Sequence, residues 1–108
     1  FVISFEDFKK LEIKIGKVLE AEKIPESNKL VKLIFDIGGE KRQIIAGIGE
    51  AYPDPTALIG KEMPVLVNLE PKSLMGYESQ GMLLAVSVSG KPILLQPEME
   101  VPPGSIVH

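Results

Sequence analysis

The segment from Leu30 to Ile48, LVKLIFDIGGEKRQIIAGI, gives the clearest indication of fold class in this 108-residue chain. Apolar and polar residues alternate in its first part with a period of two, which is typical of a half-buried β-strand. The residues of the apolar face are Val31, Leu33, Phe35 and Ile37. Gly38 and Gly39 follow, and a two-residue hairpin turn favours glycine because both positions take positive φ. With a return strand from about Lys41 to Ile48, the stretch predicts an antiparallel β-hairpin.

The residues before this hairpin predict a short helix and a bent strand. Ser4 is placed to cap a helix whose apolar stripe is Phe5, Phe8 and Leu11. From Glu12 the period changes to two, and Gly16 interrupts the alternation. A glycine with a change of phase inside a strand indicates a β-bulge or a strong bend.

The residues after the hairpin predict two more long strands and a tail. The connector from Gly49 to Gly60 holds one helical turn at 56–59, and a fourth strand then presents Met63, Val65, Val67 and Leu69 on one face. Beyond the polar loop 70–80, a fifth strand presents Met82, Leu84, Val86 and Val88. A short strand at 93–95 and a proline-rich tail that wraps the domain as irregular backbone complete the chain.

Together these elements predict an all-β fold, a closed or partly closed barrel with the element order of the oligonucleotide/oligosaccharide-binding (OB) fold. That fold is a five-stranded Greek key, and closure removes the exposed strand edges that a small sheet would otherwise present. We expect one domain over residues 1–108, with the barrel at about 5–88 after the short N-terminal helix. Residues 89–108 are then an extension beyond the five strands.

Composition narrows the possible functions. The chain has no cysteine and a single histidine, His108, so a metal centre or a histidine-based catalytic site has almost no residues to use. We therefore expect no enzymatic activity, no metal and no cofactor. No stretch is long and apolar enough to span a membrane, and we expect a cytoplasmic protein. The net charge of −3 requires that, if nucleic acid binds, acidic residues lie largely on another face.

Four segments together resemble a known family. They are 7–18, Asn28-Lys29-Leu30, 42–47 with its flanking isoleucines, and the run NLEPKSLMGYESQGM at 68–82. This pattern is similar to the tRNA-binding domain at the C-terminus of many methionyl-tRNA synthetases, which also occurs as a free-standing protein. The resemblance implies an OB barrel whose C-terminal dimerisation extension builds a homodimer, and tRNA as the partner. It leaves open whether a synthetase body is covalently attached.

Seven residues are candidates for contact with nucleic acid. They are Lys29, Lys32, Arg42, Asn68, Lys72, Ser79 and Met82. Each has an ordinary alternative: the lysines as solvated charges, Arg42 as a partner of Asp36 or Glu40, Asn68 in bonds to loop backbone, and Met82 in the core. We expect Arg42 to lie beside Lys32, and Lys29, Arg42 and Lys72 to converge on one face. Many relatives carry further basic residues where this chain has Ser73 and Met75. Their absence weakens the electrostatic attraction of this loop for RNA phosphates.

The resemblance also names a competing function. A branch of the same superfamily comprises peptide-binding export chaperones of similar length with a similar proline-rich tail. The Ser79-Gln80-Gly81-Met82 run resembles the tRNA-binding branch. Aromatic residues that could stack on unpaired bases are scarce, with Tyr52 and Tyr77 the exposed candidates, which favours recognition of folded tRNA shape over sequence reading.

Overall fold

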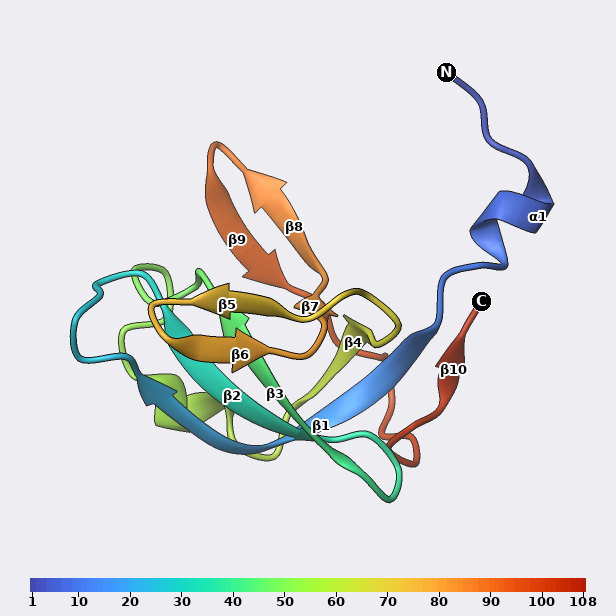
Figure 1. Cartoon of the computed structure of the whole chain (residues 1–108). Helices are drawn as coiled ribbons and strands as arrows, with labels where there is room; N and C mark the ends of the chain where they lie inside the picture. Colours follow the sequence, from blue (N-terminus) through green and yellow to red (C-terminus); the bar gives the residue numbers. More distant parts are fainter.

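The computed structural model describes all residues from Phe1 to His108 as one β-rich body with a projecting N-terminal arm (Figure 1). The elements in chain order are α1 (Phe5–Phe8), β1 (Ile13–Lys23), β2 (Val31–Asp36), β3 (Lys41–Ala46), a 3₁₀ turn (Pro55–Leu58), β4 (Glu62–Leu66), β5 (Lys72–Leu74), β6 (Tyr77–Ser79), β7 (Met82–Leu83), β8 (Ala85–Val88), β9 (Lys91–Leu94) and β10 (Ile106–Val107).

Five antiparallel strands in the order β3-β2-β1-β4-β7 form a nearly closed barrel, which confirms the OB-like fold. The long strand β1 changes neighbours at Lys17, pairing with β4 before it and with β2 after it. The expected irregularity in β1 is present, but its register shift falls between Val18 and Glu20. Gly16 has a different role, because a Cβ there would lie 2.7–2.8 Å from the side chains of Ile37 and Phe35.

The β2–β3 hairpin has the predicted strands and turn. Gly38 and Gly39 adopt φ of 78° and 102°, and the Asp36 carboxylate accepts a hydrogen bond from the Gly38 N–H at 2.9 Å. The predicted inward face of β2 is fully buried and packs with apolar side chains of the other strands. The largest fully buried side chains are Phe35, Ile24, Leu33, Ile44, Met63, Val18, Val31 and Val65.

Residues 79–81 complete the barrel between β3 and β7. The Gln80 N–H donates to the Gln43 carbonyl at 2.8 Å, and the Gln43 N–H donates to the Gln80 side chain at 3.0 Å. The Ile45 N–H donates to the Ser79 hydroxyl at 3.0 Å. These bonds satisfy donors on the outer edge of β3 that a sheet edge would expose.

The prediction of a single fifth strand is wrong, because the structure divides this segment into β7 and β8. Met82 and Leu83 pair with β4, whereas the chain from Ala85 pairs only with β9, in a hairpin that rises from the barrel (Figure 1). Pro64 explains the break, because its carbonyl accepts the Leu84 N–H but it has no N–H to return, so the ladder ends there. Val86 and Val88 are therefore exposed instead of buried.

The loop 70–80 also contains structure that the sequence did not predict. Its two short strands β5 and β6 form a hairpin that packs over β3. In the fourth strand, Met63, Val65 and Val67 are buried as expected, but Leu69 lies past the strand end and is exposed.

The helix α1 and the strand β10 lie on the same side of the barrel (Figure 1). Ser4 caps α1 as predicted, its hydroxyl accepting from the Asp7 N–H at 3.1 Å, yet no residue of this helix is buried. The tail wraps the start of β1 and adds a short strand, β10, which pairs with Ile13 and Lys14.

Candidate nucleic-acid interface

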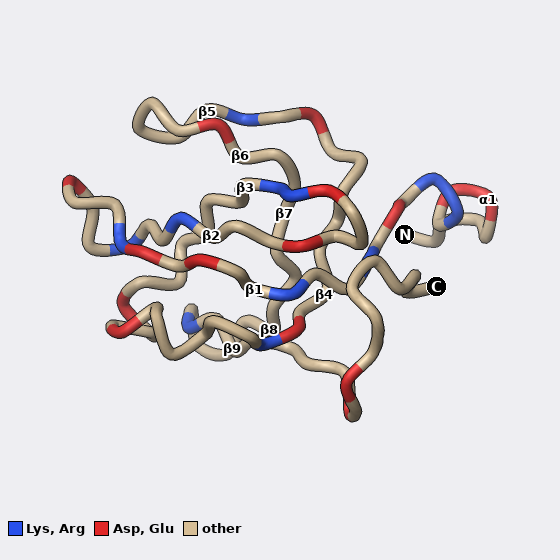
Figure 2. Tube along the Cα trace, turned by 90° about the horizontal axis from the view of Figure 1, so that it is seen from below, with Lys and Arg blue, Asp and Glu red and all other residues tan.

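The outer face of strands β1, β2 and β3 carries charges of both signs. The cross-strand register places Lys17 beside Asp36 and Asp36 beside Lys41, while Glu22 lies beside Lys32. Figure 2 shows acidic and basic residues interspersed along these strands. The expectation that acidic residues lie largely on another face is therefore wrong, because cross-strand pairs of opposite charge are favourable on a sheet.

Lys32 forms an ion pair with Glu22 across strands β1 and β2. Its Nζ lies 2.8 Å from the Glu22 carboxylate, and only a quarter of its side chain is exposed. The hydrogen bond that the Lys32 ammonium donates to Glu22 raises the pKa of Lys32 against the opposing effect of desolvation, and Tyr77 and Glu20 add smaller contributions. The lysine is fully charged at neutral pH, but a phosphate must compete with Glu22 for it.

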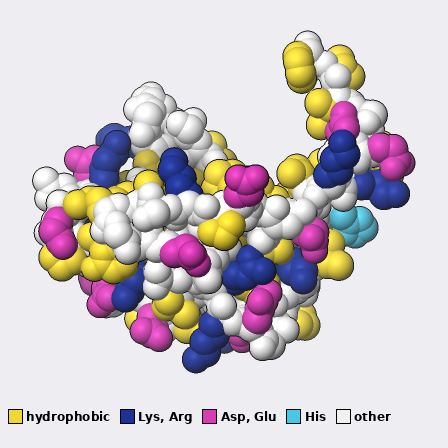
Figure 3. Space-filling model, viewed as in Figure 1, with side chains coloured by type: hydrophobic (Ala, Val, Ile, Leu, Met, Phe, Trp, Pro, Cys, Tyr) yellow, Lys and Arg dark blue, Asp and Glu magenta, His cyan; other side chains and the backbone are white.

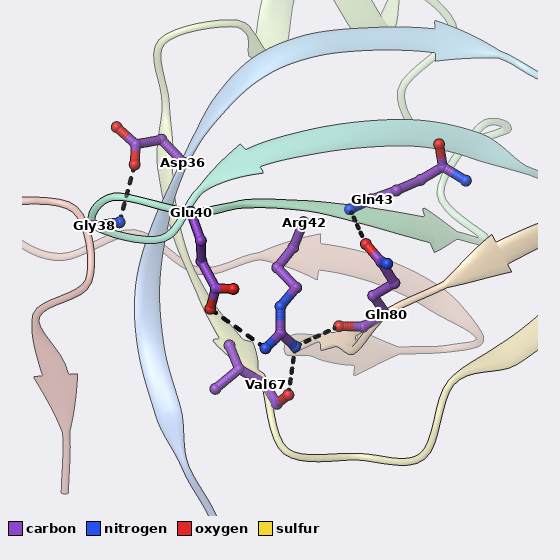
Figure 4. A network of polar contacts seen from close by, with 7 residues as sticks. All are labelled: Asp36, Gly38, Glu40, Arg42, Gln43, Val67 and Gln80. Carbon is purple, nitrogen blue, oxygen red and sulfur yellow. Dashed lines mark hydrogen bonds and ion pairs between the residues drawn. The ribbon is translucent and has the colours of Figure 1, made fainter.

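Arg42 does not lie beside Lys32, as the sequence suggested. Lys32 pairs with Ile45, whereas Arg42 pairs with the buried Phe35 and so points to the inner side of the sheet, at the end of the barrel. Figure 4 shows its guanidinium reaching across to the segments that follow β4 and β6. It donates to the Val67 carbonyl at 2.6 Å and to the Gln80 carbonyl at 3.0 Å, and pairs with Glu40 at 3.3 Å.

Asn68 and Ser79 are likewise engaged within the protein. The Asn68 amide accepts from the Glu12 N–H at 2.9 Å and donates to the Lys10 carbonyl at 2.7 Å, which ties the N-terminal arm to the end of β4. Ser79 is 5% exposed, and its hydroxyl accepts from the Ile45 N–H and donates to the Gly81 carbonyl. Both side chains hold the scaffold in the geometry of this structure.

Lys29, Lys72 and Met82 are the exposed candidates. Neither lysine forms an ion pair within the chain. Met82 is 45% exposed and is not a core residue; it lies with Ile45 and Pro92 at a small apolar depression. Lys72 is on the β5–β6 hairpin, opposite Ser79.

The predicted convergence of Lys29, Arg42 and Lys72 is wrong. Arg42 lies near the Gly38-Gly39 turn, which we name the closed end of the β2–β3 hairpin. Lys29 lies beyond Val31 at the other end, which we name the loop end, where the segments 24–30 and 47–52 meet. Phe35 lies four positions after Val31 on β2, a span of about 13 Å.

Sequence reasoning missed the parts of the site that depend on contacts across the chain. Tyr77 lies close enough to Lys32 to affect its pKa, although the two are 45 positions apart in sequence. The Gln43 side chain donates to the Glu78 carbonyl at 2.9 Å and holds β6 over β3. Only Gly76 gave a local signal for the β5–β6 turn, where it takes a φ of 84°; Met75 also takes a positive φ, but a methionine does not indicate it.

The side chains that commonly bind metal ions are dispersed over the chain. No group of three or more histidine, cysteine, aspartate or glutamate residues is gathered in a way that could hold a metal ion. None of its helices has the length and apolar character needed to cross a membrane.

The nearly closed five-stranded barrel places the chain in the class of OB-like folds. Residues 13–106 match the family model described as a putative tRNA binding domain, and the chain belongs to this family. The resemblance noted in the sequence is thereby confirmed.

The relatives fall into two groups. The methionine–tRNA ligase of Archaeoglobus fulgidus is 57% identical over 105 residues, which are 97% of this chain and 16% of that protein. The chain thus spans about one sixth of the length of the curated relatives that it matches. A solved MetRS-related protein from Pyrococcus horikoshii is 42% identical with a TM-score of 0.94, covering 100% of this chain and 99% of that chain. The chaperone CsaA from Bacillus anthracis is 34% identical with a TM-score of 0.91, and both chains are covered fully.

Proposed function

We propose that this chain is a non-catalytic module that binds folded tRNA and serves as an appended domain of a methionine–tRNA ligase. The observation that carries the proposal is the family match over 13–106, joined to 57% identity with such a ligase. A free-standing module is the variant of this proposal that the solved MetRS-related protein favours, because the match covers 99% of that chain. Both forms act in the cytoplasm, where translation takes place.

In this proposal the RNA backbone contacts Lys29 and Lys72. Their ammonium groups have no carboxylate partner, so a phosphate gains a charge contact without breaking an ion pair. Lys32 and Met82 lie nearby and contribute secondarily, the first through its exposed part and the second through apolar contact. Arg42, Asn68 and Ser79 act indirectly, because their hydrogen bonds hold the segments that present these side chains.

Shape recognition follows from the shortage of stacking surfaces. The chain has no tryptophan, both tyrosines are half-buried, and the exposed phenylalanines Phe1 and Phe5 lie on the N-terminal arm. Single-strand readers use exposed aromatic rings for successive bases. A module that relies on a few lysines therefore binds a rigid, folded RNA better than a flexible strand, because a folded RNA holds its phosphates at fixed spacing.

We further propose that the module works as a homodimer joined through the N-terminal arm and the tail. Phe5, Phe8 and Leu11 line an apolar groove with Ile106 and Val107. Phe5 and Ile106 are 70% and 69% exposed, which is costly for large apolar side chains that stay in water. Strand β10 also has only one neighbour, β1, so its outer edge is free for a second copy.

A binding comparison tests the proposed function. Affinities are measured at physiological salt for a tRNA transcript, an unstructured RNA of equal length and an unfolded polypeptide. We expect the tRNA to bind at least tenfold more tightly than the unstructured RNA, with affinity falling as salt rises. Equal affinity for the two RNAs contradicts recognition of folded shape.

The export-chaperone function is the second candidate, and one observation favours it. The similarity to CsaA is joined by apolar side chains exposed on the arm and on the β8–β9 hairpin. In that case the polypeptide is the tight ligand and its binding is insensitive to salt. If the dimer covers the arm, the surface left for peptides shrinks to the hairpin.

A further inference from the structure

A hollow at the loop end of the barrel is lined by lysines from two separate parts of the chain. It has a volume of about 610 Å³ and lies between the loop 47–52, Lys29 and the tip of the β8–β9 hairpin. The charged residues on its wall are Lys29, Lys91 and Glu50. Lys91, like Lys29, forms no ion pair within the chain. Figure 3 shows basic side chains at the foot of the raised lobe that this hairpin forms.

The backbone fixes Lys29 on its side of the hollow. The Ser27 hydroxyl accepts hydrogen bonds from the N–H groups of Lys29 and Leu30, both at 3.1 Å. The Gly49 N–H donates to the Lys29 carbonyl at 2.7 Å and joins the loop 24–30 to the loop 47–52. A lysine with its backbone held at two points loses less entropy when it binds than one on a free loop.

Lys91 is fixed on the opposite wall by the hairpin that carries it. It pairs with Val88 next to the Ser89-Gly90 turn, where both residues take positive φ. The Leu94 N–H donates to the Tyr52 hydroxyl at 3.1 Å, and both residues pack against the core. The hairpin therefore stands in a defined position relative to the loop 47–52.

We propose that this hollow is a binding site for one backbone phosphate of the RNA, held between the ammonium groups of Lys29 and Lys91. The proposal rests on the proposed function and extends the RNA path from β5–β6 onto a hairpin outside the barrel. Two lysines and Glu50 give the hollow a net charge of +1, which matches the single negative charge of a phosphodiester. Glu50, which repels the phosphate, is an acceptor suited to a ribose hydroxyl and so orients the nucleotide.

The test compares lysine variants of the full chain in tRNA binding titrated with salt. Lys29→Ala and Lys91→Ala are each expected to weaken binding about five- to tenfold at 0.1 M salt. Because the two lysines share one phosphate, each variant is expected to reduce the salt slope by about one at most. Lys61→Ala removes an equally exposed and unpaired lysine outside the hollow, and is expected to change neither quantity. Unchanged melting temperatures verify that the variants fold.

A double variant distinguishes a shared phosphate from two independent contacts. If both lysines hold the same phosphate, Lys29→Ala/Lys91→Ala weakens binding by less than the product of the single effects. Wild-type affinity in Lys91→Ala, beside weakened binding in Lys29→Ala, overturns the site while leaving tRNA binding intact. Absence of tRNA binding by the unaltered chain overturns the proposed function itself.

Discussion

The two ends of the β2–β3 hairpin use their positive charges in different ways. At the closed end, the Arg42 guanidinium donates hydrogen bonds to two backbone carbonyls and forms an ion pair with Glu40. At the loop end, Lys29 and Lys91 face a hollow without an ion-pair partner. A basic residue on a ligand-binding fold is therefore a candidate for binding phosphate only when it has no ion-pair partner within the protein.

The largest effect is expected at the closed end. Arg42→Ala leaves the carbonyls of Val67 and Gln80 without their charged donor, and we expect the free energy of unfolding to fall by about 2–4 kcal/mol. Lys41→Ala, next in sequence and without an ion pair, is the control and should change it by about 0.5 kcal/mol or less. Urea unfolding measures both. Equal stability of the two variants would contradict the structural role of Arg42.

A smaller loss is expected at the barrel closure. Ser79→Ala removes the buried acceptor of the Ile45 N–H, at a cost of about 1–3 kcal/mol. Ser73 lies on the neighbouring strand β5, is exposed and has no side-chain hydrogen bond of its own, so Ser73→Ala should be nearly neutral. Thermal melting of the Ser79→Ala and Ser73→Ala variants measures the two stability changes. If tRNA affinity falls while the melting temperature of Ser79→Ala stays unchanged, the hydroxyl contacts RNA directly.

Met82 gives a third comparison, with a methionine in the core. Because Met82 is 45% exposed, Met82→Ala should cost less than about 1 kcal/mol, whereas Met63→Ala at a fully buried position should cost about 2–5 kcal/mol. Chemical denaturation of both variants checks the difference. Similar losses in the two variants contradict the exposed position of Met82.

The smallest effect concerns pH. The pKa of Lys32 is raised above its ordinary value of 10.5, so the favourable pairing with Glu22 is present below that value and is lost only as pH rises through the folded pKa. Lys32 thus keeps its charge from pH 6 to 9. The ratio of tRNA affinities between Lys32→Ala and the unaltered chain should be constant over this range. A ratio that changes steadily with pH contradicts the assignment.

The sequence predicted those elements that are specified locally. The alternation in 31–37 and the two glycines that follow predict the β2–β3 hairpin, because strand periodicity and turn type depend on neighbouring residues. The broken fifth strand was not predictable in this way. Its end at Leu84 depends on the missing N–H of Pro64, twenty positions earlier in the chain.

The site was less predictable than the fold for the same reason. Lys29 and Lys72 were found as exposed basic residues on loops, a property that local sequence indicates. The burial of Ser79 depends on Ile45, and the engagement of Arg42 depends on Val67 and Gln80. Such long-range contacts assign a polar side chain to the scaffold, and only the folded chain reveals them.

The most direct test of the account is the salt dependence of tRNA binding when lysines without an ion-pair partner are removed. Lys29→Ala/Lys72→Ala is compared with Lys41→Ala/Lys61→Ala, which has the same net charge but loses two exposed lysines that form no ion pair and lie outside the proposed interface. The account predicts that the plot of log affinity against log salt becomes shallower by about two in the first variant and is unchanged in the second. Equal slopes in the two variants, whether both fall or neither does, would contradict it.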